Sequence, residues 1–559
     1  MNSADLTVDF LVVGSGAGGM AAAVTAAHLG MDTLVIEKDV KYGGTSALSG
    51  GVIWVPNNHQ MARAGISDSE DDAMRYLDQV VSADVPREKL RKYVQEAPKM
   101  LKFLEQHSLV KFAPAPEYPD YYAELEGGKL GARSLDPKPY SIRKLGVDLL
   151  RQMNPGPLKI RNRFSMTAAE AHEIFSFSWR SGFTIFKRLF IYWLDLPARL
   201  RKLPDNRLTL GKALVSRLRH SLQRAQVPLW LNARAVEIIT EENRVTGLVV
   251  ACDGRRQVIA VRKGLLLAAG GFAQCAELRP QYQPQVPAGQ WSAANHTDTG
   301  DGIKLGRAAG GQIGMMHCAW WTPSMVMPNQ VVEALIVGKS FPGSIVVDQA
   351  GERFCNEAEP YEDFVKHQFQ ANAVPAWLIF DARYRQEYPL GTALVPKKYL
   401  PDEAYKPLFE SGWIKKAPTL AALAETCSID QAGLLRTAEK IARFARQGHD
   451  EDFGRGGCAN DVYYSDHRIK PNPCLSALEA GPFYAIKLWP GDLGTKGGLI
   501  TDTNGQVLDT DNQPIAGLYA CGNTAASVMG DSYPGAGSTL GPAMTFGYIA
   551  AKHAAGDRT

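Results

Sequence analysis

The chain has 559 residues, of which 45% are hydrophobic and 21% are charged, and its formal net charge is +3 at pH 7. A chain of this length and composition can bury a large core and is expected to form two or more domains or subdomains. A net charge this small for the length argues against a nucleic-acid-binding protein.

The eight cysteines are scattered along the chain without a CxxC pair. This spacing argues against a zinc site, an iron–sulfur site and a disulfide framework, so we expect no metal and a reduced, cytoplasmic location. Residues 1–7 lack the basic segment of a signal peptide, and no run of about 18 apolar residues predicts a membrane-spanning helix.

A dinucleotide-binding motif lies near the start of the chain. The apolar run Phe10–Val13 passes into a glycine-rich turn and an alanine-rich segment, and a second apolar run ends in Glu37. This is the order and spacing of a βαβ unit with its ribose-binding acid. The glycines allow a tight turn, approach to a pyrophosphate and close helix packing, while free N–H groups at the helix start hold the phosphates. The residues expected to bind the nucleotide are Gly14, Ser15, Gly16, Gly19, Glu37 and Lys38.

A loop of small residues, Lys41–Gly51, follows this motif. Such a loop could run beside a large flat ring, whereas a nicotinamide enzyme has no obvious need for it. The loop resembles the one that passes along the FAD in the fumarate reductase/succinate dehydrogenase superfamily of flavoproteins. Some members attach the flavin through a histidine in this loop, but none lies between Glu37 and Asn58, so the resemblance implies non-covalent FAD. The expected contacts are Gly44, Thr45, Ser46, Gly50 and Gly51.

Residues 69–107 are predicted to be helical, with breaks near Pro86 and Pro98. A proline-punctuated loop with three tyrosines, residues 114–122, comes next. Loops that present aromatic hydroxyls commonly do so for a ligand. A loop anchored in the core by its rings is an equal alternative, and the residues alone leave both interpretations open.

Residues 142–204 form a basic, aromatic segment, with twelve basic and four acidic residues and hence a local net charge of +8. An amphipathic, cation-flanked helix of this kind can lie in a membrane interface or cover an apolar pocket. A helical hairpin with a buried apolar face is the alternative. Our hypothesis is that the segment docks the protein on anionic lipid.

Residues 208–302 are expected to return to the nucleotide fold. The backbone near Val236 is expected to meet an adenine. A buried run ends at Ala269 and Gly270, as a parallel strand beside a cofactor would. Asp301 starts a helix and is expected against the ribityl or pyrophosphate part of FAD, although an ordinary N-terminal cap is an equal possibility.

Residues 319–491 contain no second nucleotide motif and are predicted to form an inserted α+β catalytic cap over the flavin. The chain then returns to the nucleotide fold, where a glycine-rich turn before the last helix would place N–H groups beside the flavin. The expected contacts here are Gly522, Asn523, Thr539 and Leu540. The predicted fold is therefore α/β, with a Rossmann-like FAD-binding domain of residues 1–318 and 492–559 that carries the insertion at 142–204.

Three motifs together are similar to those of the 3-ketosteroid Δ1-dehydrogenases, bacterial flavoenzymes of steroid degradation. The motifs are Pro119–Tyr122, Arg353–Glu357 continuing to Tyr361, and Tyr533–Gly537. The similarity covers nearly the whole chain, but residues 142–204 are longer than in compact members, and Ala536 stands where proline is expected. The resemblance implies that Tyr121, Tyr361, Tyr533 and Gly537 carry the chemistry.

The implied reaction is 1,2-desaturation of a 3-ketosteroid. A base removes the C2 proton while a hydride passes from C1 to N5 of FAD, and this requires donors that stabilise the C3 oxygen as an enolate forms. The resemblance gives the donor roles to the Tyr533 hydroxyl and the Gly537 N–H, and the base role to Tyr361. A phenol has a reference pKa of about 10, and a hydrogen bond from Tyr121 is expected to lower that of Tyr361.

Other functions stay open at this stage. A 3-ketosteroid Δ4-(5α)-dehydrogenase is a near alternative, and a fumarate reductase-like flavoprotein would need arginines and histidines directed at two carboxylates. A flavin-binding membrane or partner protein is the non-enzymatic alternative. The expected partners are a 3-ketosteroid or sterol, an electron acceptor such as a quinone, and the inner face of the cell membrane.

Overall fold

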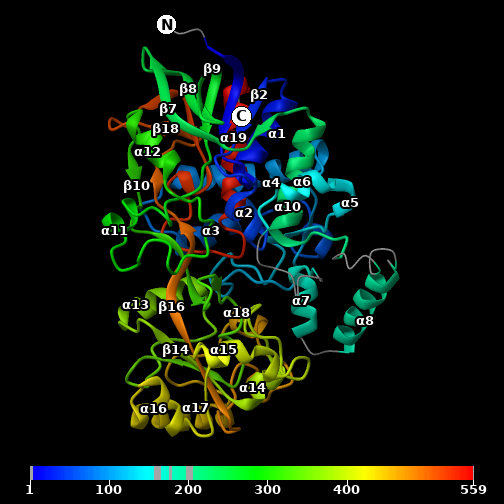
Figure 1. The fold of residues 1–559 in the computed structure, drawn as a ribbon, viewed down its shortest axis with the longest axis vertical. Coiled ribbons are helices and arrows are strands. Elements are labelled where there is room, and N and C mark those ends of the chain that lie inside the picture. Colours follow the sequence, from blue (N-terminus) through cyan, green and yellow to red (C-terminus); the bar gives the residue numbers. More distant parts are fainter. Residues whose placement is uncertain are drawn as a thin grey trace.

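The computed structural model describes residues 4–155, 165–175, 179–194, 196, 200 and 205–557. Figure 1 shows an upper part, which contains both ends of the chain, and a lower part connected to it by the long strand β16 (Phe483–Thr495). The expected boundary at 491/492 falls inside this continuous strand. The domain limits therefore stay a prediction, although the order of nucleotide fold, cap and nucleotide fold matches the elements.

The upper part is built on an eight-stranded sheet with the order β18-β19-β8-β9-β1-β2-β6, in which β7 pairs with β8. Strand β1 lies parallel to β2 on one side and to β9 on the other, as the βαβ motif predicts. The strands are β1 (Leu6–Val13), β2 (Thr33–Ile36), β6 (Leu229–Trp230), β7 (Ala233–Glu241), β8 (Arg244–Cys252), β9 (Arg255–Leu267), β18 (Gln506–Leu508) and β19 (Pro514–Ala520).

Two helices of the upper part, α1 (Ala17–His28) and α19 (Leu540–Ala555), touch backbone to backbone. A Cβ atom on Gly18 would lie 2.7 Å from the carbonyl oxygen of Ala543, and one on Gly547 would lie 2.5 Å from that of Gly18. Glycine is required at this crossing because any side chain would separate the helices. The C-terminal helix is thereby fixed against the start of the nucleotide motif.

The lower part contains a six-stranded sheet with the order β12-β11-β16-β14-β13, in which β15 pairs with β16. Its strands are β11 (Ala319–Val326), β12 (Val332–Ala334), β13 (Ser344–Val347), β14 (Ala376–Phe380), β15 (Lys415–Ala417) and β16. Its main helices are α13 (Tyr361–Gln370), α14 (Ala382–Glu387), α16 (Leu420–Cys427), α17 (Gln431–Gln447) and α18 (Ala459–Tyr463). Sheet and helices together confirm the expected α+β composition of the cap.

Of the two predicted helix breaks, one is confirmed and one is wrong. Helix α3 (Glu70–Val80) ends before Pro86, but α4 (Arg87–His107) continues through Pro98. Leu90, Val94 and Leu101 of α4 are almost fully buried. Because an amphipathic helix is stabilised mainly by packing of its apolar face, this burial compensates for the hydrogen bond that Pro98 cannot donate.

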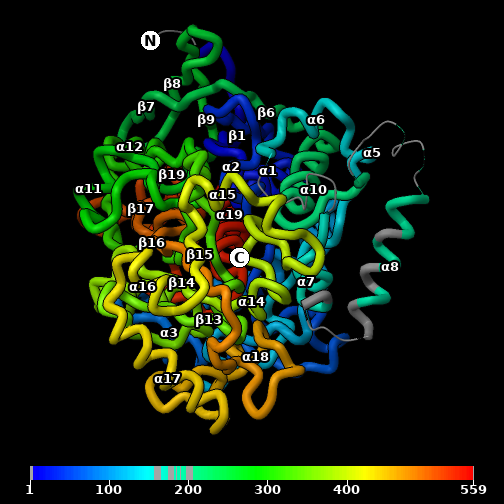
Figure 2. Tube along the Cα trace, turned by 60° about the horizontal axis from the view of Figure 1, so that its bottom comes forward, coloured from blue at the N-terminus to red at the C-terminus, as the bar shows by residue number. Residues whose placement is uncertain are grey.

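The predicted insertion contains four described helices, α5 (Ile142–Leu145), α6 (Val147–Arg151), α7 (Ala168–Phe175) and α8 (Trp179–Leu194). Within the predicted insertion, residues 156–164, 176–178, 195, 197–199 and 201–204 lie outside the described residues. Helix α8 stands apart from the body of the molecule in both views (Figures 1 and 2). Among the described residues, no helix combines the length and hydropathy needed to cross a bilayer.

Candidate active site

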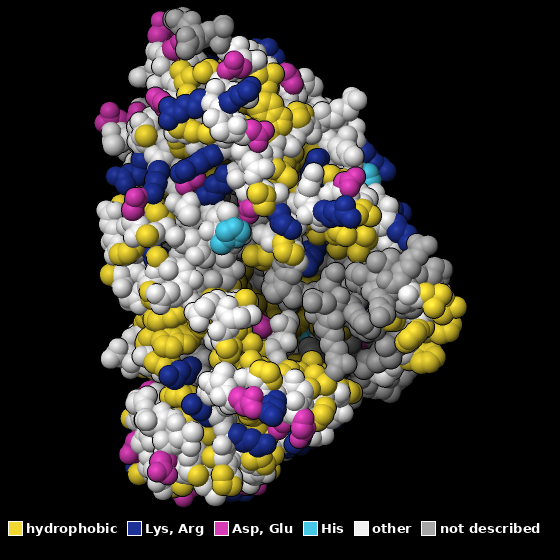
Figure 3. Space-filling model, viewed as in Figure 1, with side chains coloured by type: hydrophobic (Ala, Val, Ile, Leu, Met, Phe, Trp, Pro, Cys, Tyr) yellow, Lys and Arg dark blue, Asp and Glu magenta, His cyan; other side chains and the backbone are white. Residues whose placement is uncertain are grey.

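A cavity of about 1660 Å³ is lined by residues of the upper part and of the cap. Figure 3 shows the surface hollowed between these two parts. All of the residues predicted to bind cofactor or substrate line this cavity, with the exception of Val236. Successive side chains of a strand alternate between its faces, so Ala233 and Ala235 of β7 face the cavity and Val236 does not.

The first glycines of the motif have distinct structural roles. Gly14 has φ +108°, and a Cβ there would lie 2.3 Å from the carbonyl oxygen of Ala268. A Cβ on Gly19 would lie 2.3 Å from the carbonyl oxygen of Gly14, which confirms the close helix packing expected at this position. A Cβ on Gly16, in contrast, would meet only Ser46 Oγ, at 3.5 Å. Packing does not require glycine at position 16, so the close approach of a pyrophosphate stays the expected reason for glycine there.

The acid at the end of β2 is held by the glycine loop. The backbone N–H and the hydroxyl of Ser15 both donate to Glu37 Oε2, at 3.0 and 2.6 Å. Lys38 donates to Thr299 Oγ1 at 2.6 Å and pairs with Asp301 at 3.1 Å, which joins β2 to the start of α12 (Asp301–Ala308). Burial raises the pKa of Asp301, but Lys38 and Thr299 outweigh it and hold the pKa below its usual value.

A second buried acid lies deeper in the same wall. Asp298 lines the cavity and accepts a hydrogen bond from Thr45 Oγ1 at 3.1 Å. Burial is the main cause that raises the pKa of Asp298 to about 7. Gly270, with φ +80°, is required beside it, because a Cβ there would lie 2.4 Å from Asp298 Oδ1. This wall therefore carries a carboxyl group that can be neutral near pH 7.

The structure brings the three predicted tyrosines together from distant segments. The ring centroids of Tyr361 and Tyr533 are 5.2 Å apart, those of Tyr121 and Tyr533 5.5 Å apart, and those of Tyr121 and Tyr361 5.7 Å apart. All three rings line the cavity that the glycine loop also lines. The hydroxyl of Tyr533 lies 3.2 Å from Thr539 Oγ1. The hypothesis of a phenol cluster thus has the geometry that it needs.

The loop of residues 533–537 is fixed by backbone contacts to its neighbours. The carbonyl oxygen of Pro534 accepts from Tyr121 N at 3.0 Å and from Tyr76 Oη at 2.5 Å. Gly537 has φ +98°, and a Cβ there would lie 2.5 Å from the backbone of Ile53 and Trp54. Burial raises the pKa of Tyr533, and hydrogen bonds from Thr539, Tyr361 and the Gly537 backbone partly offset this. The Gly537 N–H and the Tyr533 hydroxyl therefore lie beside each other.

The pKa of the predicted base differs from the expectation. A hydrogen bond from Tyr121 lowers the pKa of Tyr361 as predicted, but burial is the larger effect, and the net pKa lies well above 10. Burial also raises the pKa of Tyr121 well above 10. Desolvation opposes the charged phenolate. Sequence reasoning identified the hydrogen bond and could not weigh it against the enclosure of the ring.

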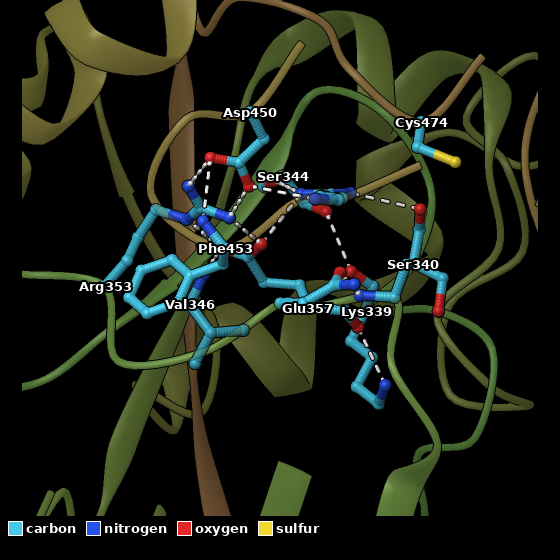
Figure 4. A network of polar contacts seen from close by, with 12 residues as sticks. Lys339, Ser340, Ser344, Val346, Arg353, Glu357, Asp450, Phe453 and Cys474 are labelled. Carbon is cyan, nitrogen blue, oxygen red and sulfur yellow. Dashed lines mark hydrogen bonds and ion pairs between the residues drawn. The ribbon is translucent and has the colours of Figure 1, made fainter. Parts of the chain in front are cut away.

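A buried ionic network holds the chain just before Tyr361 (Figure 4). Arg353 forms two bonds of 2.7 Å to Glu357 and one of 2.8 Å to Asp450 Oδ2, while Arg455 contacts Glu357 at 3.2 Å. Lys339 donates to the carbonyl oxygens of Glu357 and Glu359 at 2.7 Å each. Glu357 and Asp450 balance the charges of the two arginines. Lys339 is a third buried cation, and the two carbonyl oxygens hold its ammonium, so the network fixes the approach to α13.

Sequence analysis missed a second aromatic group at the cavity. The Tyr118 hydroxyl forms a hydrogen bond with the Tyr464 hydroxyl, and the Tyr118 ring stacks on Tyr463 at 4.6 Å. His172 of α7 stacks on the other side of Tyr463 at 3.9 Å. The adjacent tyrosines 463 and 464 could have been noticed, but only tertiary structure places them against the loop of residues 114–122.

Comparison with known proteins agrees with this geometry. Residues 9–540 match the family model described as FAD binding domain. The chain is 40% identical to the 3-oxosteroid 1-dehydrogenase of Mycolicibacterium smegmatis, over 97% of this chain and 96% of that protein. It is 38% identical to the 3-oxosteroid 1-dehydrogenase of Comamonas testosteroni, over 98% of this chain and 96% of that protein.

A solved structure is similar over the same range. The crystal structure of 3-ketosteroid Δ1-dehydrogenase from Sterolibacterium denitrificans, in complex with 1,4-androstadiene-3,17-dione, has a TM-score of 0.94 and 41% sequence identity. The match covers 99% of this chain and 100% of that one.

The glycine loop, the large cavity and the family match define an FAD-dependent oxidoreductase. The chain belongs, more narrowly, to the 3-oxosteroid 1-dehydrogenase family. FAD is its cofactor, and the absence of a covalent link to the flavin stays a prediction. The expected Rossmann-like fold with an α+β cap is confirmed.

Proposed function

We propose that the protein introduces a 1,2 double bond into a 3-ketosteroid. The observation that carries the proposal is the convergence of Tyr121, Tyr361 and Tyr533 with the Gly537 N–H in the cavity that the glycine loop lines. The shared activity of the relatives described above supports it. The walls around these groups are largely aromatic and aliphatic, which suits a steroid better than a dicarboxylate such as fumarate.

In the proposed mechanism, the Tyr533 hydroxyl and the Gly537 N–H donate hydrogen bonds to the C3 oxygen. These hydrogen bonds become stronger as negative charge develops on that oxygen. Removal of one such donor from an oxyanion site raises the activation free energy by about 3–4 kcal/mol. Tyr361 acts as the phenolate and becomes a neutral phenol when it takes the proton from C2, and Tyr121 donates a hydrogen bond to the phenolate oxygen. Bound FAD supplies the acceptor for the hydride that leaves C1. Enclosure by the cap excludes water from the reacting atoms.

The test is the substitution Tyr361→Phe in the FAD-loaded enzyme, assayed with a 3-ketosteroid and a dye acceptor. Loss of a general base is expected to reduce kcat by about 10²–10⁴-fold, while the flavin absorbance is unchanged. Tyr384→Phe, which removes a buried hydroxyl bound to the Gly338 carbonyl at 2.6 Å, is the matched control and should retain activity. Turnover by Tyr361→Phe at the wild-type rate would contradict the assigned base.

The pH dependence gives a second check on the base. Because burial raises the pKa of Tyr361 above 10, the ionised form increases as the pH rises. The wild-type kcat/KM is therefore expected to increase from neutral to alkaline pH, and a profile that falls over this range would contradict the proposal. Product analysis separates Δ1 from Δ4-(5α) chemistry, because a saturated 3-ketosteroid would gain its double bond at C1–C2 and not at C4–C5.

We also infer that the protein lies on a membrane through α8, on the side that faces the cytoplasm. Phe183, Phe186, Phe190 and Trp193 of α8 are 61%, 65%, 55% and 59% exposed, and they recur on one side of the helix. Figure 3 shows hydrophobic side chains projecting at the right-hand edge of the molecule, where α8 lies in the same view. Lys187 is exposed on the same helix. An exposed apolar face beside cations suits a bilayer with anionic lipid.

The neighbouring helix connects this face with the reaction site. Ala168, Ala171 and His172 of α7 line the cavity. Arg188 of α8 reaches back to Asp205 at 3.0 Å and also lines the cavity. A steroid dissolved in lipid would therefore meet the cavity wall directly behind the apolar face, and a lipid-soluble quinone is the electron acceptor that this location favours.

Co-sedimentation with vesicles tests this inference. The double substitution Phe186→Glu and Phe190→Glu is expected to abolish binding to vesicles of phosphatidylglycerol and phosphatidylcholine, because a charge at the interface opposes burial of the helix face. Leu130→Glu, at an apolar residue that is 69% exposed outside α8, is the control and should bind as the wild type does. Equal binding by the double variant would refute the docking surface.

A further inference from the structure

The first turn of α13 carries two acids directly after the predicted base. Glu362 and Asp363 follow Tyr361, and neither is needed for the chemistry described above. The helix dipole stabilises carboxylates in the first turn of a helix. It can explain why acids occur here, but it does not explain the specific side chains that these acids contact. Asp363 contacts the neighbour of Tyr121 directly, and Glu362 is linked to the neighbour of Tyr533 through Lys496.

Glu362 is connected to the residue before Tyr533. Its side chain is 1% exposed, and its Oε1 accepts from Lys496 Nζ at 2.6 Å. Lys496 is itself fully buried and donates to the carbonyl oxygen of Ser532 at 2.7 Å. Its ammonium also lies 4.4 Å from the ring centroid of Trp320, and that ring packs edge to face on Tyr533 at 5.0 Å.

Asp363 is connected to the residue after Tyr121. The Tyr122 hydroxyl donates to Asp363 Oδ2 at 2.7 Å, across 241 residues of sequence. Tyr122 thus joins the loop of residues 114–122 to α13. Of the two links, this one is a direct hydrogen bond between side chains, and a single hydroxyl group makes it on the loop side.

We propose that Glu362 and Asp363 are positioning residues that set the distances between the three phenols. The base is the first residue of α13, and the next two residues hold the segments that carry Tyr533 and Tyr121. Reacting groups must be placed within a fraction of an ångström. The three tyrosines come from segments far apart in the sequence, so contacts between folded segments must set the distances between them. This inference rests on the proposed function of the tyrosines.

The experiment compares Tyr122→Phe with Tyr388→Phe in the FAD-loaded enzyme. Both substitutions remove one phenol-to-aspartate hydrogen bond in or beside the cap, since Tyr388 Oη donates to Asp466 Oδ2 at 2.6 Å. Tyr122→Phe is expected to lower kcat by about 10-fold or more, because small misplacements near reacting atoms can cost up to about 100-fold. KM should change little, and the pH profile of kcat should shift. Tyr388→Phe should behave as the wild type.

A double-mutant cycle separates positioning from general loss of structure. Asp363→Asn and Tyr122→Phe are expected to have the same effect on kcat, and their combination should be no worse than either alone. Asp363→Glu should recover part of the activity. Additive effects of the two substitutions, or an unchanged kcat and pH profile in Tyr122→Phe, would overturn the inference.

The link from Glu362 through Lys496 to Ser532 is tested with the substitution Lys496→Met. Flavin absorbance shows whether the variant folds and binds FAD. An FAD-loaded variant with wild-type kcat would contradict the role of Glu362, and a loaded variant with lowered kcat and unchanged KM would support it. If the protein cannot be loaded, Glu362→Gln, which keeps an acceptor for Lys496, is measured in the same way. Should the wild type itself fail to oxidise any 3-ketosteroid, the proposed function fails first, and that outcome is distinct from a wild type that turns over while Tyr122→Phe is unaffected.

Discussion

The two sides of the cavity are built by different means. On the cofactor side, glycines and backbone N–H groups form the wall, and a few side chains such as Ser15 and Glu37 fix the loop. Where the cap meets the upper part, the wall is made of phenol rings from three separate segments, and of these only Tyr361 comes from the cap. Backbone recognition needs only a local sequence, whereas the phenol cluster exists only after the whole chain has folded.

This difference decides what a substitution can damage. At Gly14 and Gly19 of the glycine loop, a single added methyl group meets backbone carbonyl oxygens at 2.3 Å. In the phenol cluster, a missing hydroxyl removes one interaction and leaves the packing in place. The following four predictions sharpen this contrast.

The largest effect is expected in the glycine loop. Gly14→Ala places a Cβ 2.3 Å from the Ala268 carbonyl oxygen at a left-handed φ, so the protein should lose both stability and FAD. Gly16→Ala, whose Cβ would meet only Ser46 Oγ at 3.5 Å, should fold but bind FAD poorly. Thermal melting and flavin absorbance distinguish the two. Equal melting temperatures of both variants would refute the separate roles.

The next effect concerns the substrate side. Tyr533→Phe should lower kcat by about 10²–10³-fold, the cost of losing one oxyanion donor, with FAD retained. Thr539→Ala, which removes a hydroxyl 3.2 Å from that of Tyr533, should have a smaller effect in the same direction. Steady-state rates with a 3-ketosteroid measure both, and a larger loss for Thr539→Ala would contradict the assignment.

A third prediction tests how the cap supports the base. Glu357→Gln leaves Arg455 without its buried carboxylate and Arg353 with Asp450 alone, and should destabilise the cap by about 3–5 kcal/mol. Glu352→Gln breaks an exposed ion pair with Arg436 and should cost at most about 1 kcal/mol. Urea unfolding followed by tryptophan fluorescence gives the comparison. Similar midpoints for the two variants would show that the network does not stabilise the cap.

The smallest effect is expected at Asp298, whose pKa burial raises to about 7. The folded state then binds more protons than the unfolded state between about pH 4 and pH 7, so stability falls as the pH rises through this range. Asp298→Asn removes the buried charge and should raise the melting temperature by about 2 °C or more at pH 8, and by less at pH 5. A gain that is larger at pH 5 would reverse the assigned direction.

The nucleotide motif could be predicted because its signals are local. Strand, turn, helix and acid lie within about 30 residues, and each has a composition imposed by its own backbone. The roles of Gly14 and Gly19 follow from the turn and the helix contact alone. The adenine contact expected from the backbone near Val236 stays a prediction, and in this strand Ala233 and Ala235 are the residues that line the cavity.

The site tyrosines could be identified by resemblance to a family but not by physical reasoning from the residues. Tyr121, Tyr361 and Tyr533 are separated by hundreds of residues, and a chain with 20 tyrosines offers many such sets. Tyr463, Tyr464 and the acids of α13 were missed for the same reason, since their roles depend on partners far away in sequence.

The amino-acid sequence by itself determined the parallel βαβ unit with its dinucleotide-binding motif and the basic, aromatic character of residues 142–204. Those properties depend on neighbours along the chain, so short-range sterics and hydrophobic spacing suffice to specify them. Only the tertiary structure decided that α4 passes through Pro98, that burial outweighs the hydrogen bond in setting the pKa of Tyr361, and that the α8 face is exposed. Burial and electrostatics are sums over all surrounding atoms, and those atoms are known only once the chain is folded.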